Sequence, residues 1–151
     1  MSLAVRLATP DDLAPLAALF DQYRQFYEQA ADLDRARTFV AERMARGESI
    51  IFVAADTQGT LLGFCQLYPS FCSVAAAPIL VLYDLFVAPG ARRLGLAKAL
   101  MQAAQDYATA QAVARMDLTT AHTNTKAQAL YISLGWQLDT VFRAYTWASK
   151  P

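Results

Sequence analysis

Residues 80–101 combine three features that together would bind a phosphate group. An apolar run ends at Val87, a Pro-Gly turn follows, and the segment from Arg92 opens an amphipathic pattern that predicts a helix over about 92–112. The first peptide N–H groups of a helix have no partners within it and lie at the positive end of its dipole, so they stabilise an anion. Gly95 would let that anion approach the backbone closely. The stretch therefore predicts an anion-binding site.

The pattern differs from two common phosphate-binding motifs. No Lys-Ser or Lys-Thr pair follows Gly95, as a P-loop requires, and the stretch contains no Gly-x-Gly-x-x-Gly of a dinucleotide-binding fold. What remains is Arg-x-x-Gly-x-Ala after a strand, formed by Arg92, Gly95 and Ala97. On its own this short pattern is a signal of moderate strength.

A second motif lies downstream, between a predicted strand and the C-terminus. Asn124 is followed three residues later by Ala127, seven later by Tyr131, and then by Gly135-Trp136 at the end of a predicted helix. Ala127 and Tyr131 are four residues apart and so share one helical face. From periodicity alone, Tyr131 is either a core aromatic or a proton donor facing a site.

Together the two motifs, within about residues 79–141, resemble the GNAT superfamily of acetyl-CoA-dependent N-acetyltransferases. The resemblance implies an α/β GNAT fold, in which a mixed, mostly antiparallel sheet with splayed central strands is flanked by helices. It is closest to the diamine and polyamine acetyltransferase-like group, through Asp84 to Val87 and the C-terminal aromatic residues. In that group a Glu precedes the Asp of the strand, whereas this chain has Tyr83.

The resemblance also implies roles for particular residues, with acetyl-CoA as cosubstrate. Tyr131 is expected to act as general acid, and Asp84 as a base, an ammonium-binding group or a structural carboxylate. The amine would contact Tyr27, Glu28 and Asp84. Strand backbone would pair with the pantetheine amides, helix-start amides would bind the pyrophosphate, and the Val87 N–H would stabilise the oxyanion. The expected acetyl-CoA contacts are Leu85, Phe86, Val87, Arg92, Arg93, Leu94, Gly95, Leu96, Ala97, Lys98, Asn124 and Tyr131.

The elements that must position these residues follow from apolar periodicity and turn signals. Thr9-Pro10 predicts the start of a first helix, and Asp32 the start of a second that ends near Gly47. Residues 69–78 are expected to form a loop or a short helical turn. The predicted strands are 3–7, 50–55, 61–68, 79–87, 115–120, 136–141 and 144–148, with a last helix over 124–134. The order is βααβββαβαββ in one acetyltransferase domain over residues 1–151.

Composition restricts the partners. Thirteen basic and thirteen acidic residues leave no net charge, so nothing draws the whole chain to nucleic acid or anionic lipid. No apolar run approaches the roughly 20 residues of a membrane span, and the N-terminus has no signal-peptide pattern. Cys65 and Cys72 have no partnering His pattern, so free thiols, a cytoplasmic location and no metal site are expected. The 56% hydrophobic content, with edge strands near the C-terminus, favours a homodimer.

Two classes of function fit these observations. The first is acetylation of the primary amine of a small molecule, such as a diamine, a polyamine or an amino-acid-like compound. A protein N-terminus and an aminoglycoside are further possible acceptors within this class. The second is a non-catalytic acyl-CoA-binding or protein-interaction module on the same fold, because a fold does not determine an activity.

Overall fold

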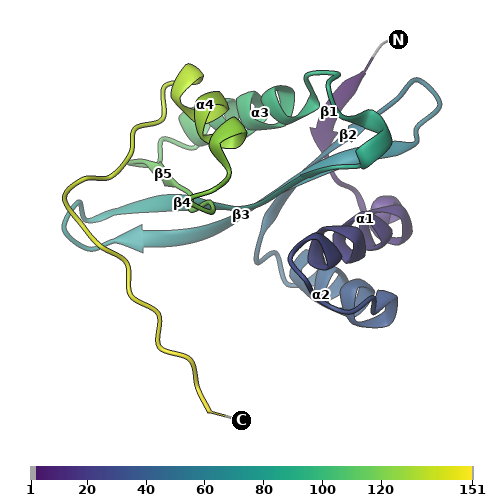
Figure 1. Cartoon of the computed structure of the whole chain (residues 1–151), viewed down its shortest axis with the longest axis horizontal. Coiled ribbons are helices and arrows are strands. Elements are labelled where there is room, and N and C mark those ends of the chain that lie inside the picture. The colour runs from purple at the N-terminus through teal and green to yellow at the C-terminus, as the bar shows by residue number, and fades with distance from the viewer. Residues whose placement is uncertain (1–2, 151) are drawn as a thin grey trace. The chain divides into compact units, whose positions relative to one another are not determined.

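The computed structural model describes residues 3–150, and their internal contacts divide them into two units, residues 3–119 and residues 120–150. A single domain over residues 1–151 stays a prediction, and residues 1, 2 and 151 lie outside the described part. The first unit contains β1 (Ala4–Leu7), α1 (Leu13–Phe26), α2 (Leu33–Ala45), β2 (Ile50–Ala55), β3 (Leu61–Cys72), β4 (Ala77–Val87), α3 (Leu96–Ala110) and β5 (Met116–Asp117), and the second contains α4 (Thr125–Ser133) (Figure 1).

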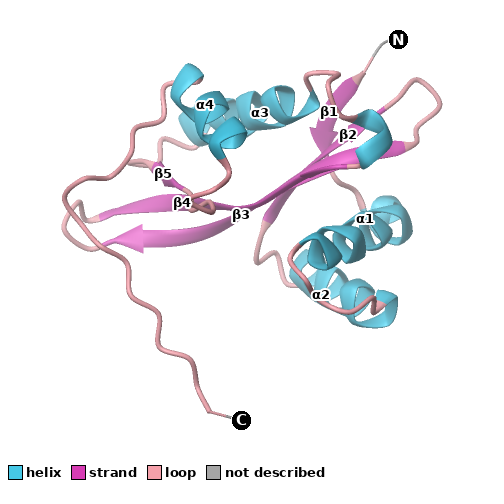
Figure 2. Ribbon diagram, viewed as in Figure 1, coloured by secondary structure: helices cyan, strands magenta, loops and turns pink. Residues whose placement is uncertain are grey.

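One five-stranded sheet in the order β1-β2-β3-β4-β5 organises the first unit. The first four strands pair antiparallel, and β5 pairs parallel to β4. The sheet is therefore mixed and mostly antiparallel, as expected. Helices α1 and α2 cover one face and α3 covers the other (Figure 2).

Adjacent residues of β3 show how the two faces are filled. Phe64 points into the main apolar cluster with Leu16 and Phe20 of α1 and Val40 of α2. The next residue, Cys65, is buried on the opposite face, where its thiol donates to the Leu100 carbonyl of α3 at 3.8 Å. Because successive side chains of a strand alternate, the continuous apolar run of β3 fits a strand covered on both faces.

A carboxylate organises the start of α1, where Thr9-Pro10 predicted a helix start. Asp12 lies in a single 3-10 turn, Pro10–Asp12, and its Oδ2 accepts the Thr9 N–H at 2.7 Å. The Arg6 guanidinium of β1 donates to both carboxylate oxygens, at 2.7 and 2.9 Å. These hydrogen bonds lower the pKa of Asp12 to about 2, the Arg6 bonds most strongly. Asp12 therefore ties the first strand to the first helix.

Asp12→Asn is expected to lower the free energy of unfolding by about 1–3 kcal/mol at neutral pH. Since the pKa of Asp12 is lower in the folded chain than its ordinary value of 3.8, its contribution is present above that value and is lost as the pH falls toward 2. Denaturant unfolding at several pH values measures this. Asp11→Asn, on an exposed neighbour in the same turn, is the control. Equal stabilities of the two variants would contradict the assignment.

The segment 69–78 is not the predicted loop. Strand β3 continues to Cys72 and β4 begins at Ala77, with Pro69 opposite Leu80 and Phe71 opposite Pro78. Turn-forming and small residues, including Ala75–Ala77, favoured a loop, but each strand has its neighbour on the other side of the hairpin, and the two prolines do not interrupt this pairing. The turn is reduced to residues 73–76, where Ala76 adopts a φ of +50°.

Three further predictions near the C-terminus are wrong in extent or existence. The strand expected over 115–120 is reduced to Met116–Asp117. The closing strands 136–141 and 144–148 do not form, so the observed order is βααβββαβα. A strand requires backbone pairing with a neighbour, and side-chain alternation alone does not supply it.

Among the described residues, no helix is both long and apolar enough to cross a membrane.

Candidate functional site

One edge of β4 is open over its second half. On one side β4 pairs with β3 from Ala77 to Val87, but on the other side only Leu80 and Val81 pair, with β5. Within the described chain, residues 82–87 therefore have no strand on the β5 side. This is the predicted splay between central strands, and it leaves a strand edge free for an extended ligand.

The backbone direction at the end of β4 follows from one hydrogen bond. The Ala88 N–H donates to the Leu62 carbonyl of β3 at 2.8 Å. Because backbone groups alternate in direction along a strand, Leu85 and Val87 turn their N–H groups toward the open edge. Phe86 faces β3 with its backbone and the α1 side of the core with its side chain. Of the three predicted strand contacts, Leu85 and Val87 thus present backbone groups to the edge.

A close approach of strands holds this end of β4 in place. Gly63 of β3 lies opposite Val87, and a Cβ built at Gly63 would come within 2.8 Å of the Phe86 carbonyl oxygen. The same Cβ would contact Leu100 of α3 at 3.4 Å. A glycine is needed here for space, because its absent side chain lets the strand pair pack directly beneath α3.

The predicted anion-binding segment is a loop followed by a helix start. A 3-10 turn spans Pro89–Ala91, and α3 begins at Leu96 rather than near Arg92. Arg93 and Gly95 have φ values of +69° and +75°. These left-handed values are incompatible with an α-helix, so the helix begins only after Gly95. The N–H groups of residues 96–98 have no backbone acceptor among the described residues. They are the unpaired donors expected at a helix N-terminus.

The surroundings of this helix start are open at Gly95. A Cβ built there meets no atom within 4 Å, so space lies directly over the backbone. Arg93 and Lys98 are exposed beside it, whereas the Leu96 side chain is buried in the core. Leu96 can therefore contribute only its backbone to an anion site.

Arg92 is held by protein groups. Its Nε donates to the Val87 carbonyl at 3.2 Å, and its guanidinium lies 5.9 Å from the ring centres of Phe26 and Phe86. These contacts join the loop to the end of β4 and to α1. Arg92 therefore has a structural role in addition to the predicted phosphate contact.

Asp84 is buried on the side of the sheet that α1 covers, with 4% of its surface exposed. Its Oδ2 accepts a hydrogen bond from Gln66 Nε2 at 2.7 Å, and Gln66 Oε1 accepts one from the Ser49 hydroxyl at 2.8 Å. Burial raises the pKa of Asp84, although hydrogen bonds from Gln66 and Tyr23 oppose the increase. The described residues provide no ion pair to this carboxylate.

Three tyrosines surround the carboxylate. Burial, and then the negative charge of Asp84, raise the pKa values of Tyr23 and Tyr68. The β3–β4 register shifts between Gln66 and Leu67, so Tyr83 bulges outward, and its ring lies 5.4 Å from that of Tyr68. The bulge leaves Asp84 pointing inward between aromatic rings.

The predicted amine contacts on α1 differ in position. Tyr27 ends the helix, and its ring lies 5.1 Å from that of Tyr23, which links it to the tyrosines around Asp84. Glu28 is exposed with a φ of +65°, and its described hydrogen bond is from its own N–H to the Gln25 carbonyl. Tyr27 is therefore connected to the surroundings of Asp84 through Tyr23, whereas Glu28 lies exposed just after the end of α1.

The second unit carries the other predicted residues. Asn124 caps α4, since its side-chain oxygen accepts the Ala127 N–H at 3.4 Å. Gly135 ends the helix with a φ of +92°, and the Trp136 N–H returns to the Tyr131 carbonyl at 3.0 Å. The Tyr131 and Trp136 rings lie 6.4 Å apart. The Asn-to-Trp motif thus forms one capped helix with Tyr131 half-buried on it.

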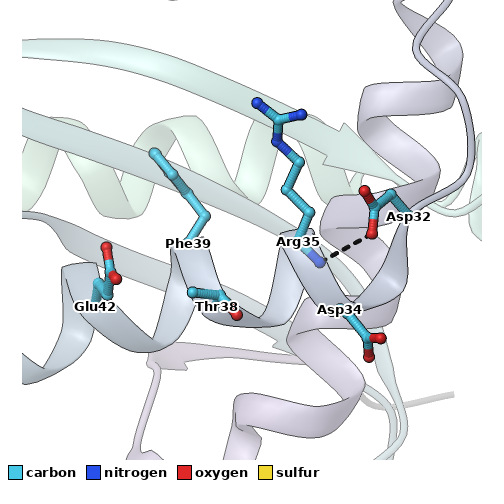
Figure 3. Close-up of a pocket in the computed structure, with 6 residues that line it drawn as sticks. All are labelled: Asp32, Asp34, Arg35, Thr38, Phe39 and Glu42. Carbon is cyan, nitrogen blue, oxygen red and sulfur yellow. Dashed lines mark hydrogen bonds between the residues drawn. The ribbon is translucent and has the colours of Figure 1, made fainter.

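A hollow of about 470 Å³ lies elsewhere, along α2 (Figure 3). All its lining residues come from this helix and its N-cap, where Asp32 accepts the Arg35 N–H at 3.1 Å. The hollow includes none of the predicted catalytic or binding residues. Its lining residues are Asp32, Asp34, Arg35, Thr38, Phe39 and Glu42.

Comparison with known proteins identifies the family. A family model described as acetyltransferase (GNAT) family matches residues 16–136. The chain belongs to the GNAT acetyltransferase family. An uncharacterized N-acetyltransferase of Bacillus subtilis, YhfO, is 44% identical over 93% of this chain and 94% of its own length. The crystal structure of a probable acetyltransferase matches with a TM-score of 0.91 and 38% identity, covering 100% of this chain and 99% of that one.

A more distant relative has a named substrate class. It is an aminoglycoside N(6')-acetyltransferase type 1 of Salmonella typhimurium, 28% identical over 73% of this chain and 68% of its own length.

The family model and the two similar acetyltransferases confirm the expected family, fold class and acetyl-CoA requirement. The protein is an N-acetyltransferase that uses acetyl-CoA as its acetyl donor.

The geometry fits this cosubstrate. Bound acetyl-CoA supplies an activated acetyl thioester, with a pyrophosphate and an extended arm that contains amides. The open β4 edge matches the amides, and the unpaired N–H groups below Gly95 match the pyrophosphate. The N-acetyltransferase thus has suitable groups for both parts in its first unit.

Sequence reasoning missed Gln66 and Ser49. Gln66 is 1% exposed, although amides are seldom buried without a partner. It is the one amide side chain within the run Leu61–Tyr68, and this isolated position was the available signal. Ser49 precedes β2 and gave no signal of its own.

Proposed function

We propose that this N-acetyltransferase acetylates the primary amine of a small cationic molecule, a diamine, a polyamine or an amino-acid-like compound. The observation that carries the proposal is the buried Asp84 carboxylate, which has no cationic partner among the described residues. A buried charge is costly unless it is paired. A substrate ammonium beside Asp84 would supply the missing charge, and the rings of Tyr23 and Tyr68 would add cation–π attraction.

Asp84 also has a chemical role in this proposal. An ammonium must lose a proton before its nitrogen can attack a thioester, and a carboxylate accepts that proton better when its pKa lies closer to neutrality. Burial raises the pKa of Asp84 in this direction. The hydrogen bonds from Gln66 Nε2 and from Tyr23 hold the carboxylate in place, and the carboxylate receives the proton, directly or through a water molecule.

The remaining groups act on the acetyl transfer itself. The Val87 N–H, at the open edge of β4, stabilises the negative charge that develops on the carbonyl oxygen. Leu85 and the backbone around Gly95 position acetyl-CoA, with Arg93 and Lys98 adding positive charge nearby. Tyr131 donates a proton to the departing thiolate. A phenol of pKa near 10 can protonate a thiolate of pKa about 8.5 only when geometry and local charge assist it.

An aminoglycoside is a second candidate acceptor, favoured by the Salmonella relative named for that activity. Aminoglycosides carry several amines, so the same carboxylate would bind them. Acetylation of a protein N-terminus, or acyl-CoA binding without catalysis, would use the same cosubstrate groups on β4 and α3.

We also propose that the protein is a homodimer with a cytoplasmic location.

A panel of amines tests this proposal. Purified protein with acetyl-CoA is incubated with diamines, polyamines, amino acids, aminoglycosides and peptides with free N-termini, and released thiol is measured. We expect the highest kcat/KM for a small cationic molecule with a primary amine, namely a diamine, a polyamine or an amino-acid-like compound. A preference for peptides would refute the proposed acceptor, and acetyl-CoA binding without turnover on any amine would favour the non-catalytic module.

Tyr131→Phe is expected to lower kcat about 10²-fold, at the low end for loss of a general acid, because a thiolate is already a moderate leaving group. The dissociation constant for acetyl-CoA, measured by calorimetry, is expected to change less than about threefold. Tyr145→Phe, which removes an exposed hydroxyl from the same unit, is the control. An unchanged kcat for Tyr131→Phe with the best amine would show that another group protonates the thiolate.

A further inference from the structure

We propose that Ser49 is a positioning residue for acetyl transfer, whose hydroxyl donates to Gln66 Oε1 and thereby keeps the amide nitrogen of Gln66 directed at the Asp84 carboxylate. The inference deepens the proposed function, and its effect on catalysis rests on that function because Asp84 is the proposed base. Its effect on the Asp84 carboxylate is measurable without any substrate.

The register of the sheet brings these three polar side chains together on one face. Gln66 of β3 lies directly opposite Asp84 of β4 and opposite Ile51 of β2. Residues that face each other across antiparallel strands share a face, as do residues two apart on one extended strand. Ser49 comes two residues before Ile51, in the segment that leads from α2 into β2. Its hydrogen bond to Gln66 places its side chain on the same face.

The Gln66 amide is buried, and each of its two ends has a partner. Gln66 exposes 1% of its surface. Its Nε2 donates to Asp84 Oδ2 at 2.7 Å, and its Oε1 accepts from the Ser49 hydroxyl at 2.8 Å. Within the described part of the chain, Ser49 is the side-chain donor that this oxygen has. A buried amide oxygen without a donor is costly, so the Ser49 bond stabilises the observed orientation of the amide.

Hydrogen-bond partners, and not packing, select between the two orientations of this amide, because its nitrogen and oxygen are nearly equal in size. If the amide were turned end for end, Oε1 would face the Asp84 carboxylate. The Ser49 hydroxyl hydrogen would at the same time lose its acceptor. Removal of the Ser49 hydroxyl takes away this second penalty and leaves Oε1 without its donor in the observed orientation.

The orientation of the amide determines how tightly Asp84 holds a proton. An N–H donor stabilises a carboxylate, whereas a carbonyl oxygen stabilises the protonated acid, which can donate to it. In the observed orientation the Gln66 bond lowers the pKa of Asp84, against the larger upward effect of burial. With Oε1 facing Asp84 this opposition would be lost and the pKa would rise further. Ser49 thus limits the increase in the pKa of the proposed base.

The ionisable neighbours of Asp84 are phenols and a thiol, which as a class lose their protons well above the range of a carboxyl group. They are Tyr23 of α1, Cys65 and Tyr68 of β3, and Tyr83 beside it on β4. Burial raises the pKa of Cys65 to about 12 and those of Tyr23 and Tyr68 as well.

On α2, Arg43 acts on this group of side chains through Tyr68, and its guanidinium is paired with Glu42 and Glu48. These pairs are not altered by a substitution at Ser49. A change in the pKa of Asp84 in a Ser49 variant is therefore assigned to the amide of Gln66.

NMR of the full chain, labelled at its aspartate carboxyl groups, tests the orientation without a substrate. The Asp84 signal is assigned by its absence from Asp84→Asn and is followed against pH. Ser49→Ala is expected to raise the pKa of Asp84 by about 0.5–1 unit, the shift to which loss of one hydrogen bond between neutral groups corresponds. Ser49→Thr keeps the hydroxyl and is the matched control, expected to stay within about 0.2 unit of the wild type. Circular dichroism verifies folding.

Two results of this titration would overturn the proposal. One is an Asp84 pKa that does not move in Ser49→Ala. The other is an equal rise in Ser49→Ala and Ser49→Thr, because the hydroxyl would then be irrelevant to the carboxyl group.

A double-mutant cycle shows whether Ser49 acts through Gln66. Gln66→Met removes the amide and keeps an unbranched side chain that adapts to its surroundings. In the Gln66→Met background, Ser49→Ala is expected to change the pKa of Asp84 by less than about 0.2 unit, because residues that act through one another are not additive. A full Ser49→Ala shift in this background would refute a path through the amide.

The pH profile of kcat/KM with the best amine tests the consequence for catalysis. In Ser49→Ala the ascending limb is expected to move up by the same amount, about 0.5–1 pH unit, since this limb reports the base of the free enzyme. On the plateau above the limb, kcat/KM is expected to change less than about twofold, because Asp84 is ionised there in both proteins.

The two measurements separate failure of this proposal from failure of the proposed function. An unmoved NMR pKa with a lower plateau in Ser49→Ala would give Ser49 a structural role only. An NMR pKa that rises while the limb stays in place would confirm the action of Ser49 on the carboxyl group and reject Asp84 as the base.

Discussion

Gly95→Glu is expected to raise the dissociation constant for acetyl-CoA by about 10³-fold and to abolish turnover at ordinary concentrations. The new carboxylate would project from the backbone into the open space over the start of α3, where the pyrophosphate is proposed to bind. Two like charges about 4 Å apart near a protein surface repel by about 4 kcal/mol, which corresponds to nearly three factors of ten in affinity.

Two controls separate charge from backbone strain. Gly95 has a φ of +75°, so any side chain there costs about 1–2 kcal/mol of folding stability. Gly95→Ala carries this strain without the charge and is expected to weaken binding less than about tenfold. Gly59→Glu places the same charge at a φ of +84° in the β2–β3 turn and is expected to leave binding unchanged. Calorimetry with acetyl-CoA measures the affinity of all three variants. An unchanged affinity in Gly95→Glu would show that the pyrophosphate does not bind at this loop.

Local backbone chemistry was predicted well from the sequence. The bounds of β2, the start of α2 at its Asp32 cap and the Asn124 cap of α4 agree with the structure. Each depends on the conformational preference of a few neighbouring residues, such as a carboxylate or amide oxygen that accepts a backbone N–H. The helix was expected to begin near Arg92, which placed Gly95 inside it, but Arg93 and Gly95 both adopt positive φ and α3 begins only at Leu96.

Features that depend on distant partners were not predictable in the same way. Residues 69–72 form a strand because residues 77–80 lie opposite them, in spite of Pro69 and Pro78. The C-terminal segment has strand composition and no strand, because pairing requires a neighbour. The orientation of Asp84 depended on a bulge at Tyr83, which no single-strand pattern reveals.

The same dependence explains the missed part of the site. Gln66 donates a hydrogen bond to Asp84 on the neighbouring strand and accepts one from Ser49, which precedes β2. These partners come together only in the folded sheet. A lone amide inside an apolar strand indicates an unseen polar partner, because a buried amide without one is costly. The sequence contained that indication but not the identity of the partner.

Asp84→Asn is expected to lower kcat/KM for the best amine by about 10³-fold while changing the acetyl-CoA dissociation constant less than about twofold. Asparagine is similar in size and still offers an oxygen to Gln66 Nε2, so the packing around the side chain and its hydrogen bond are retained. What is lost is the negative charge that would hold the ammonium and the oxygen that would accept its proton, which together account for an effect of this size. Steady-state kinetics and calorimetry measure the two quantities.

The pH dependence of the same variant distinguishes a buried functional carboxylate from a structural one. Because burial raises the pKa of Asp84, the folded chain binds its proton more tightly than the unfolded chain does. Its contribution to stability is therefore complete below the unfolded pKa of about 3.9 and is lost as the pH rises through the folded value. Asp84→Asn is expected to melt at the same or a higher temperature than the wild type at neutral pH, with the difference growing as the pH rises from about 4.

Asp106→Asn, on an exposed position of α3, controls for the loss of one negative charge and is expected to alter neither activity nor melting. If Asp84 is the base, the ascending limb of log kcat/KM against pH is lost in Asp84→Asn. If the carboxylate only holds the ammonium, KM rises and the limb remains. A variant that melts earlier than the wild type at neutral pH and keeps its kcat/KM would identify Asp84 as a structural group. If Asp84→Asn lowers activity while its stability stays the same or rises, the Asp84 carboxylate is needed for the reaction although its charge destabilises the fold.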